Sequence, residues 1–157
     1  MSATKTNAMR ILDKLKIEYQ VHTYDSSDGK IDGISVAEKV GRKPEELYKT
    51  LVTKGKKDYF VFVIPVDKEL NLKECAKTVG EKSVEMIPTA DLLKVTGYIR
   101  GGCSPVGMKK SYVTVVDSAA QELETITFSG GKIGLQIELT PSDLQKAANV
   151  QYAHITE

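Results

Sequence analysis

The chain has 157 residues, of which 41% are hydrophobic and 27% charged, the composition of an ordinary soluble globular domain. Because 22 Lys and Arg oppose 21 Asp and Glu, the formal charge is only +1. Such a balance argues against a protein that grips long nucleic acid by itself, since that affinity comes from neutralised phosphates. DNA is therefore not an expected partner, whereas a ligand with a few phosphates is allowed.

Cysteine usage and the absence of long apolar runs indicate the compartment. No apolar run reaches membrane-spanning length, and the N-terminus lacks the apolar core of a signal peptide. Cys75 and Cys103 show no pairing pattern, which fits a reducing compartment. His22 and His154 lie far apart and neither cysteine has a partner at metal-ligand spacing. We expect one cytoplasmic domain over residues 1–157, with no metal, cofactor or membrane partner.

The first half of the chain alternates between helical and period-2 patterns. The expected elements are, in order, a helix over 4–16, a strand over 19–24, a mobile loop over 25–33, a helix from a Ser35 to Glu38 capping box to Gly41, and a hairpin of strands 48–53 and 59–65. The second strand of that hairpin is apolar throughout and belongs in the centre of a sheet.

The second half is punctuated by helix caps and glycines. The expected elements are a helix from Asn71 to Gly80 with Leu72, Cys75, Ala76 and Val79 buried, a strand over 82–87, a helix over 88–96, a strand over 112–117, a turn over 118–123, a strand over 133–139, a helix from Thr140 and a strand over 150–155. Together these elements predict an α/β domain with a mixed, curved sheet or a pseudo-barrel, surrounded by helices.

A glycine-rich loop from Thr96 to Lys110 separates two of these elements. Its four glycines and one proline exclude a helix or a central strand, and they would let a ligand lie against main-chain groups. The cations Arg100, Lys109 and Lys110 favour an anionic ligand, although a long surface turn with solvated lysines is equally consistent. Cys103 has no neighbouring histidine to form a thiolate, so it is not expected to be a nucleophile.

Lys49 stands out because it interrupts an apolar strand. Side-chain alternation places it on one face with Leu47 and Leu51. Such a lysine either lines a cavity or extends its ammonium to solvent at a sheet edge, and spacing alone favours the edge. His22, which lies on the 19–24 strand, is expected to be a hydrogen-bonded structural residue.

Four motifs occur together in a fixed order: Tyr48-Lys-Thr-Leu51, Asn71-Leu-Lys-Glu-Cys-Ala76, the Gly97 to Lys110 loop, and Ser129-Gly-Gly-Lys-x-Gly134. This set resembles the YbaK/EbsC family of aminoacyl-tRNA deacylases, relatives of the editing domain of bacterial prolyl-tRNA synthetases, and the match runs almost end to end. The resemblance implies a single pseudo-barrel domain that removes a wrongly attached amino acid, best known as cysteine, from the proline tRNA.

The resemblance also implies site residues and a mechanism. Lys49 would be the essential site lysine, which reverses the reading from spacing. The substrate-binding residues would come from the strands and both glycine loops, namely Tyr24, Thr50, Gly101, Gly102, Ser104, Pro105, Ser129, Gly130, Gly131 and Gln136. In cysteine-clearing members the thiol of the substrate attacks its own ester, so no protein nucleophile is expected.

Two departures from the family bear on specificity. Cysteine-clearing relatives carry Asp at the position of Gln136, and an aromatic residue of their 25–33 loop is replaced here, with Ile31 and Asp32 nearest. The sequence thus predicts a trans-editing deacylase that binds the aminoacyl-tRNA 3' end, most readily Cys-tRNA(Pro), with prolyl-tRNA synthetase as a partner. The alternatives are a deacylase for another small amino acid such as alanine, and a non-catalytic module that binds nucleotides or tRNA ends.

Overall fold

The computed structural model describes residues 5–157. The helices are α1 (Asn7–Lys14), α2 (Gly33–Lys39), α3 (Leu72–Val79), α4 (Leu92–Thr96) and α5 (Pro141–Ala147), with 3-10 turns η1 (Thr89–Asp91) and η2 (Ser118–Glu122). The strands are β1 (Gln20–Thr23), β2 (Tyr48–Lys54), β3 (Tyr59–Pro65), β4 (Glu85–Met86), β5 (Val113–Asp117), β6 (Ile126–Ser129), β7 (Leu135–Leu139) and β8 (Val150–Ala153).

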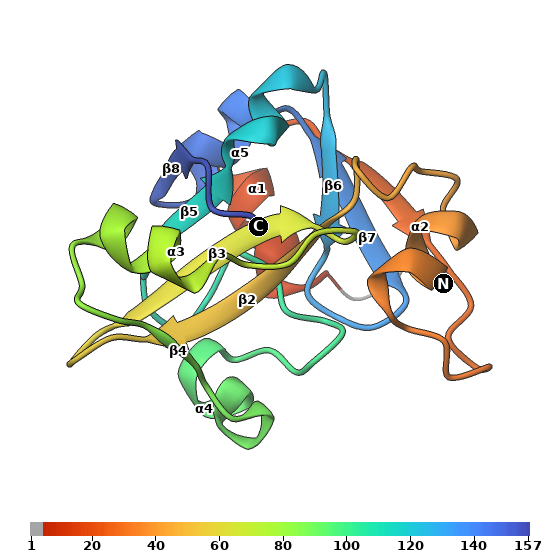
Figure 1. The fold of residues 1–157 in the computed structure, drawn as a ribbon. Coiled ribbons are helices and arrows are strands. Elements are labelled where there is room, and N and C mark those ends of the chain that lie inside the picture. The colour runs from red at the N-terminus through yellow and green to blue at the C-terminus, as the bar shows by residue number, and fades with distance from the viewer. Residues whose placement is uncertain (1–4) are drawn as a thin grey trace.

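The strands form two sheets. The larger has the order β4-β2-β3-β5-β8 and mixes the antiparallel β2–β3 hairpin with parallel β3–β5 and β5–β8 pairs. The smaller has the antiparallel order β1-β7-β6. A parallel bridge between Leu47 and Thr127 joins the two. In Figure 1 the β2–β3 hairpin crosses the middle of the molecule, with the smaller sheet beside α2. The predicted α/β fold with a mixed sheet is confirmed.

Three apolar clusters hold these layers together. The largest packs α1, β6 and β7 against one face of β2 and β3, with Leu12, Val63 and Phe128 among its fully buried members. A second packs α3 against the other face of β3 around Phe62. The third packs α2 against Leu47. β2 therefore contributes to the first two clusters, and Leu47, directly before it, contributes to the third. The two faces of β2 lie in different environments.

Several local predictions are confirmed. β3 lies between β2 and β5 and is the centre of the larger sheet. The Asn71 side chain caps α3 by accepting from the Glu74 N–H at 3.2 Å, and Gly80 ends the helix with φ 75°. Cys75 is fully buried in the core as predicted, whereas Leu72 is 40% exposed and not part of the buried stripe.

The boundaries of α1 and α2 differ from the predictions. α1 begins at Asn7 behind an N-cap at Thr6 and ends at Lys14, because Lys16 takes a φ of 58°. The predicted start at residue 4 lies outside the described residues. α2 begins at Gly33, since Asp32 accepts the Ser35 N–H and acts as the N-cap; the predicted capping box from Ser35 is therefore wrong.

Five strands are shorter than predicted: β1, β5 and β8 lose one or two residues at their ends, and β4 and β7 differ for clearer reasons. β4 covers only Glu85–Met86, because β2 offers it a partner at Thr53 and Lys54 alone. β7 begins at Leu135, because Gly134 has a φ of 93° and still belongs to the preceding turn. Both changes lengthen the loops around β2 and β6.

Candidate functional site

The two glycine-rich segments lie against each other. A Cβ built on Gly102 would sit 2.9 Å from the Cα of Lys132, and one on Gly101 would sit 3.0 Å from the Cδ1 of Ile31 and 3.3 Å from Ile133. No real side chain tolerates the first distance, so the main chain of the 96–110 loop touches the 129–134 turn directly. The glycines are required by this contact, and Ile31 brings the 25–33 loop to the same place.

Hydrogen bonds fix the shape of the 96–110 loop. The Lys109 N–H donates to the Thr96 carbonyl at 3.0 Å and closes the loop, while the Tyr98 hydroxyl donates to the Val106 carbonyl at 2.7 Å across it. Its middle, residues 102–106, is buried. The alternative of a solvated surface turn is therefore wrong for this part of the loop.

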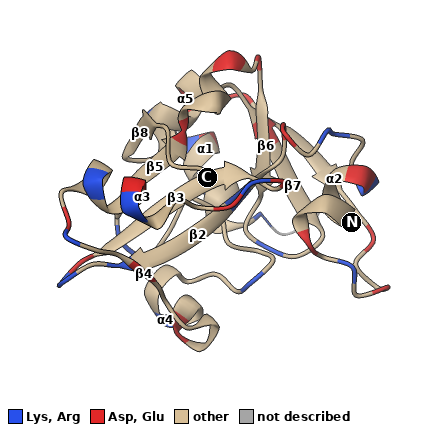
Figure 2. Ribbon diagram, in the orientation of Figure 1, with Lys and Arg blue, Asp and Glu red and all other residues tan. Residues whose placement is uncertain are grey.

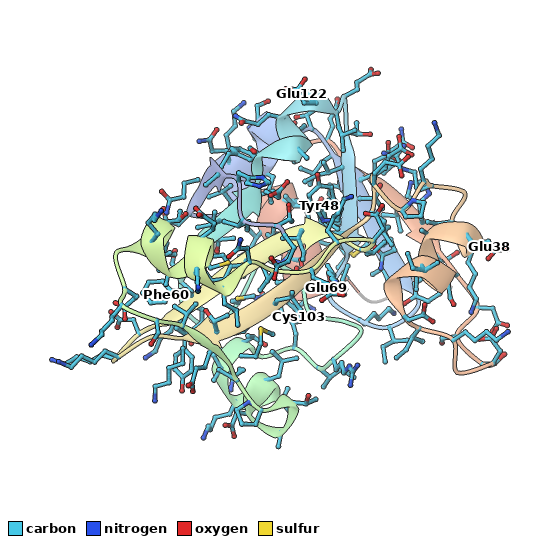
Figure 3. The ribbon with its side chains drawn as sticks, in the orientation of Figure 1. Glu38, Tyr48, Phe60, Glu69, Cys103 and Glu122 are labelled. Carbon is cyan, nitrogen blue, oxygen red and sulfur yellow. The ribbon has the colours of Figure 1, made fainter. Side chains whose placement is uncertain are left out.

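Cys103 lies inside this buried stretch and is labelled in Figure 3 on the loop that follows α4. Cys103 is 8% exposed, and burial raises the pKa of its thiol to about 12. A neutral, buried thiol is a poor nucleophile. Neighbouring Ser104 is fully buried and its hydroxyl accepts the Val106 N–H at 3.3 Å, so it supports the shape of the loop.

Strand pairing places Gln136 next to two other polar residues of the smaller sheet. Gln136 lies opposite His22 of β1 and opposite Ser129 of β6. β6 also runs parallel to β2 through the Leu47 to Thr127 bridge. Among the described residues, pairing between these two strands is limited to this bridge. Because side chains alternate along a strand, Lys49 shares a face with Leu47, and Ser129 shares a face with Thr127 and with Gln136 opposite it.

Lys49 lies between two apolar clusters. On its face of β2, Leu47 belongs to the cluster under α2 and Leu51 packs against the cluster under α3. Lys49 itself pairs with Ile64 of the central strand and is half-buried. Within residues 5–157 the structure gives its ammonium no ion pair and no hydrogen bond. A half-buried, unpaired cation beside a central strand is available to an anionic ligand or a developing negative charge.

Thr50 lies on the opposite face of β2, with the apolar residues Tyr48 and Val52. Main-chain groups of an antiparallel strand point alternately toward and away from the neighbouring strand. The Val66 N–H donates to the Leu47 carbonyl at 2.9 Å, so the main-chain groups of Leu47 point toward β3 and those of Thr50, three residues on, point away from it. β6 meets the outer edge of β2 at Leu47 and β4 meets it at Thr53, which leaves the edge open at Thr50. A ligand that contacts both Lys49 and Thr50 must cross this edge.

Several buried polar side-chain atoms have no hydrogen-bond partner. Among the described residues, the side-chain atoms concerned are Tyr24 Oη, Arg42 Nε, Tyr48 Oη, Thr50 Oγ1, Thr127 Oγ1 and Gln136 Oε1. Such atoms are rare in folded proteins and call for an explanation. Three of them, on Tyr24, Thr50 and Gln136, belong to residues that the sequence analysis assigned to substrate binding. Because these atoms are closed to solvent, a ligand can reach them only after local opening.

Tyr24 and the 25–33 loop cover this region. Tyr24 packs against the cluster under α2, and its N–H donates to the Gly134 carbonyl at 3.0 Å. The Lys39 ammonium lies 5.9 Å from the Tyr24 ring and donates to the Asp25 carbonyl at 2.7 Å and the Asp28 carboxylate at 2.8 Å. α2 therefore holds the loop over the site in this structure.

Thr127 is the residue that the sequence analysis missed. It is fully buried, its hydroxyl is unpaired, and it lies two residues before Ser129 on β6. Strand alternation could have placed it on the face of Ser129. Its closeness to Leu47 could not have been predicted from local patterns, because the bridge joins two residues 80 positions apart in the sequence.

His22 is a structural residue, as predicted. Its Nε2 lies 2.8 Å from Glu138, whose carboxylate also accepts from the Thr125 hydroxyl at 2.6 Å and lies 3.6 Å from Arg42. Burial alone would raise the pKa of Glu138, but these hydrogen bonds and the Arg42 charge outweigh it and hold the pKa below its usual value. This network anchors β1 to β7 beside the site.

Ser129, Gly130 and Gly131 form the tight turn that faces the loop. The Gly131 N–H donates to Ser129 Oγ at 3.2 Å, and the Gly130 carbonyl accepts from the Thr6 hydroxyl. Across residues 5–157 no group of three or more His, Cys, Asp or Glu side chains could hold a metal ion. In the same part of the chain, no helix is long and apolar enough to cross a membrane.

Comparison with known proteins defines the class. Residues 33–147 match the aminoacyl-tRNA editing domain family, so the chain belongs to that family. The EbsC protein of Enterococcus faecalis, named as a candidate Cys-tRNA(Pro)/Cys-tRNA(Cys) deacylase, is 46% identical over 97% of this chain and 93% of its own length. The family predicted from the order of the motifs is confirmed.

Two further similarities involve part of a ligase and one solved structure. The proline–tRNA ligase of Fervidobacterium nodosum is 34% identical over 47% of this chain, which is 13% of the ligase. The crystal structure of a candidate trans-editing enzyme for prolyl-tRNA synthetase covers 99% of each chain with a TM-score of 0.85 at 21% identity. The second likeness is one of fold.

Proposed function

We propose that residues 1–157 form one editing domain that deacylates misacylated tRNA in trans, with Cys-tRNA(Pro) as its preferred substrate. The relatives named above support the reaction class. The observation that supports the assignment of the site is that Tyr24, Thr50 and Gln136, three residues implied by the resemblance, each carry a buried oxygen without a hydrogen-bond partner.

The geometry suits an ester that is already activated. The aminoacyl carbonyl would lie beside Lys49, whose ammonium stabilises the negative charge that develops on the carbonyl oxygen. Main-chain N–H groups of the glycine loop would add to this stabilisation. The site then needs to orient the ester and exclude water, and it needs no protein nucleophile.

We further propose that cleavage is assisted by the substrate. The cysteine thiol sulfur attacks the carbonyl carbon and forms a thiolactone, the ester bond to the ribose breaks, and the thiol proton ends on the departing ribose oxygen. The buried, neutral thiol of Cys103 agrees with a site in which the protein supplies no thiolate.

Gln136 bears on which amino acid is accepted. A neutral amide oxygen attracts the substrate ammonium less strongly than a carboxylate would. Affinity then depends more on the fit of the side chain, and an alanyl ester remains the competing substrate. With a net charge of +1, the chain also gains from a partner that holds the body of the tRNA, and prolyl-tRNA synthetase fits that role.

The test is release of labelled amino acid from cysteinyl- and alanyl-tRNA(Pro) by the parent protein and by Lys49→Ala, with Lys54→Ala as an exposed control on the same strand. We expect rapid release from the cysteinyl substrate, a loss of about 100-fold or more in Lys49→Ala, and no change in Lys54→Ala. Near-normal activity of Lys49→Ala would overturn the assignment of the site.

The experiment also separates the competing functions. Faster release from the alanyl substrate would identify the alternative deacylase. No release from either substrate with the synthetase added, together with weaker binding of tRNA ends by Lys49→Ala, would identify a non-catalytic binding module.

A further inference from the structure

The glycine-rich loop and the turn that it touches are rich in basic residues. From Leu92 to Val116 the chain has four basic residues and no acidic residue, and from Thr125 to Ile137 it has Lys132 and no acidic residue. All five side chains belong to exposed residues: Lys94, Arg100, Lys109, Lys110 and Lys132. In a protein whose total formal charge is only +1, this is a local excess, and we call these five residues the basic rim.

The basic rim borders the two glycine-rich segments. The Lys109 side chain runs along Gly97, where an added Cβ would lie 3.3 Å from its Cγ, and its Nζ donates to the Lys94 carbonyl at 3.3 Å. The main chain of Lys132 touches Gly102, and Arg100 directly precedes Gly101. In Figure 2 the loop that follows α4 carries basic residues.

The basic rim is also poorly neutralised. Lys94 lies 4.0 Å from Asp91, and within residues 5–157 no ion pair is recorded for Arg100 or Lys110. By contrast, lysines elsewhere lie against carboxylates, such as Lys39 beside Asp28 at 2.8 Å. Exposed, unpaired ammonium groups are point charges that attract phosphate without demanding one geometry.

We propose that the basic rim binds backbone phosphates of the tRNA acceptor end and guides the 3' terminus to the glycine loops. This inference rests on the proposed function, because it takes aminoacyl-tRNA as the ligand. RNA is favoured over an acidic protein segment because a tRNA end brings several phosphates into a site that receives its terminal ester. Contacts of this kind position the RNA without reading its sequence.

The test compares two substrates that share the ester and differ in phosphates. Cysteinyl-tRNA(Pro) has the whole acceptor end, whereas the 3'-cysteinyl ester of adenosine has no phosphate. The triple variant Lys94→Gln, Lys109→Gln and Lys110→Gln removes three charges of the basic rim. The matched control removes three exposed lysines elsewhere, Lys14→Gln, Lys16→Gln and Lys146→Gln.

We expect the rim variant to lose roughly 30-fold in kcat/KM on the tRNA at moderate salt, about threefold for each phosphate contact removed. Its plot of log(kcat/KM) against log[salt] should be shallower than that of the parent by about two. Turnover of the adenosine ester should match the parent, and the control variant should match the parent on both substrates.

Equal losses on both substrates, or equal losses in the rim and control variants, would overturn the proposal. Binding of uncharged tRNA(Pro) is measured in parallel, so that the basic rim is tested even without turnover. A parent that binds the tRNA end through the basic rim but cleaves neither ester would disprove the proposed function and leave this inference standing.

Discussion

Two buried parts of the sheets differ in how their polar atoms are satisfied. β3 is buried from Phe60 to Pro65, and its side chains are all apolar. β6 and the first residues of β7 are equally buried, yet they carry Thr127 and Gln136 with unpaired oxygens. Burial of a polar atom without a partner costs free energy, so β3 is built for stability and the β6–β7 region gives some stability up.

The difference teaches where to look for the ligand. An unpaired buried oxygen persists when another requirement outweighs its cost, and functional sites are the usual place. Lys49 lies near both regions, because its main chain pairs with Ile64 of β3 and it follows, by two residues, Leu47, which bridges to Thr127 of β6. The following predictions test whether the polar region is a site and not merely a poorly packed part of the core.

The largest effect is expected for Gly102→Ala. The added methyl would meet the Lys132 main chain at 2.9 Å and force the two glycine segments apart. A displacement of about 1 Å at a catalytic site costs about 100-fold in rate, so we expect a loss of that size in deacylation. Single-turnover kinetics on cysteinyl-tRNA(Pro) would measure it.

Gly41→Ala is the matched control for that substitution. Gly41 has a φ of 71° and nothing within 4 Å of an added Cβ, so alanine there brings backbone strain of about 1 kcal/mol and no clash. We expect a lower melting temperature with unchanged activity. Equal activity losses in the two variants would mean that general destabilisation, and not the contact between the loops, explains Gly102→Ala.

A smaller effect is expected for Thr127→Val, which should raise stability and lower activity. Valine keeps the shape and removes an unpaired hydroxyl from a fully buried position, so the free energy of unfolding should rise by about 1 kcal/mol. If that hydroxyl meets the substrate, kcat/KM should fall by roughly tenfold, since one hydrogen bond is lost. Urea denaturation and deacylation kinetics measure the two quantities.

Thr53→Val supplies the comparison within the larger sheet. Thr53 is also fully buried, but its hydroxyl donates to the Phe60 carbonyl at 3.0 Å. Its replacement should lower the free energy of unfolding by about 1 kcal/mol and leave activity unchanged. If Thr127→Val were destabilised in the same way, the Thr127 hydroxyl would have a protein partner, and the contrast between the two regions would fail there.

The smallest effect is expected for Cys103→Ala. Burial raises the pKa of the Cys103 thiol to about 12, so the thiol is neutral near pH 7 and cannot act as a nucleophile. Because the folded pKa lies above that of the unfolded chain, the neutral thiol favours the folded state most below about pH 8.5, and the advantage fades as pH rises toward 12.

We expect activity of Cys103→Ala within about threefold of the parent, and alkylation of the folded parent by iodoacetamide much slower than that of an exposed thiol. Exposed model thiols treated at the same pH give the reference rate. Loss of all turnover in a variant that is still folded would show that the sulfur has a chemical role.

Much of the fold could be predicted from the sequence because its signals are local. Period-2 apolar runs predicted the β2–β3 hairpin, and Asn71 and Gly80 predicted both ends of α3. α2 was misplaced because Asp32 and Ser35 can each cap a helix, and only the packing of Gly33 against Val66 decides between them.

The site was predicted less completely, because it depends on contacts between distant segments. The resemblance named Tyr24, Thr50 and Gln136, and all three carry unpaired buried oxygens. That Lys49 and Thr50 point to opposite faces of β2 was predicted from side-chain alternation and not from the resemblance. Thr127 was missed, since its place depends on a bridge to Leu47 that no local pattern reports.

The most direct measurement is a crystal structure with a non-hydrolysable analogue, adenosine carrying cysteine through a 3'-amide. We predict that the amide carbonyl lies within hydrogen-bond distance of Lys49 Nζ, and that Gln136 Oε1 and Thr50 Oγ1 gain partners from the ligand. Binding instead in the groove lined by Asp13, Tyr19 and Asp143, which contains none of the proposed site residues, would contradict the account.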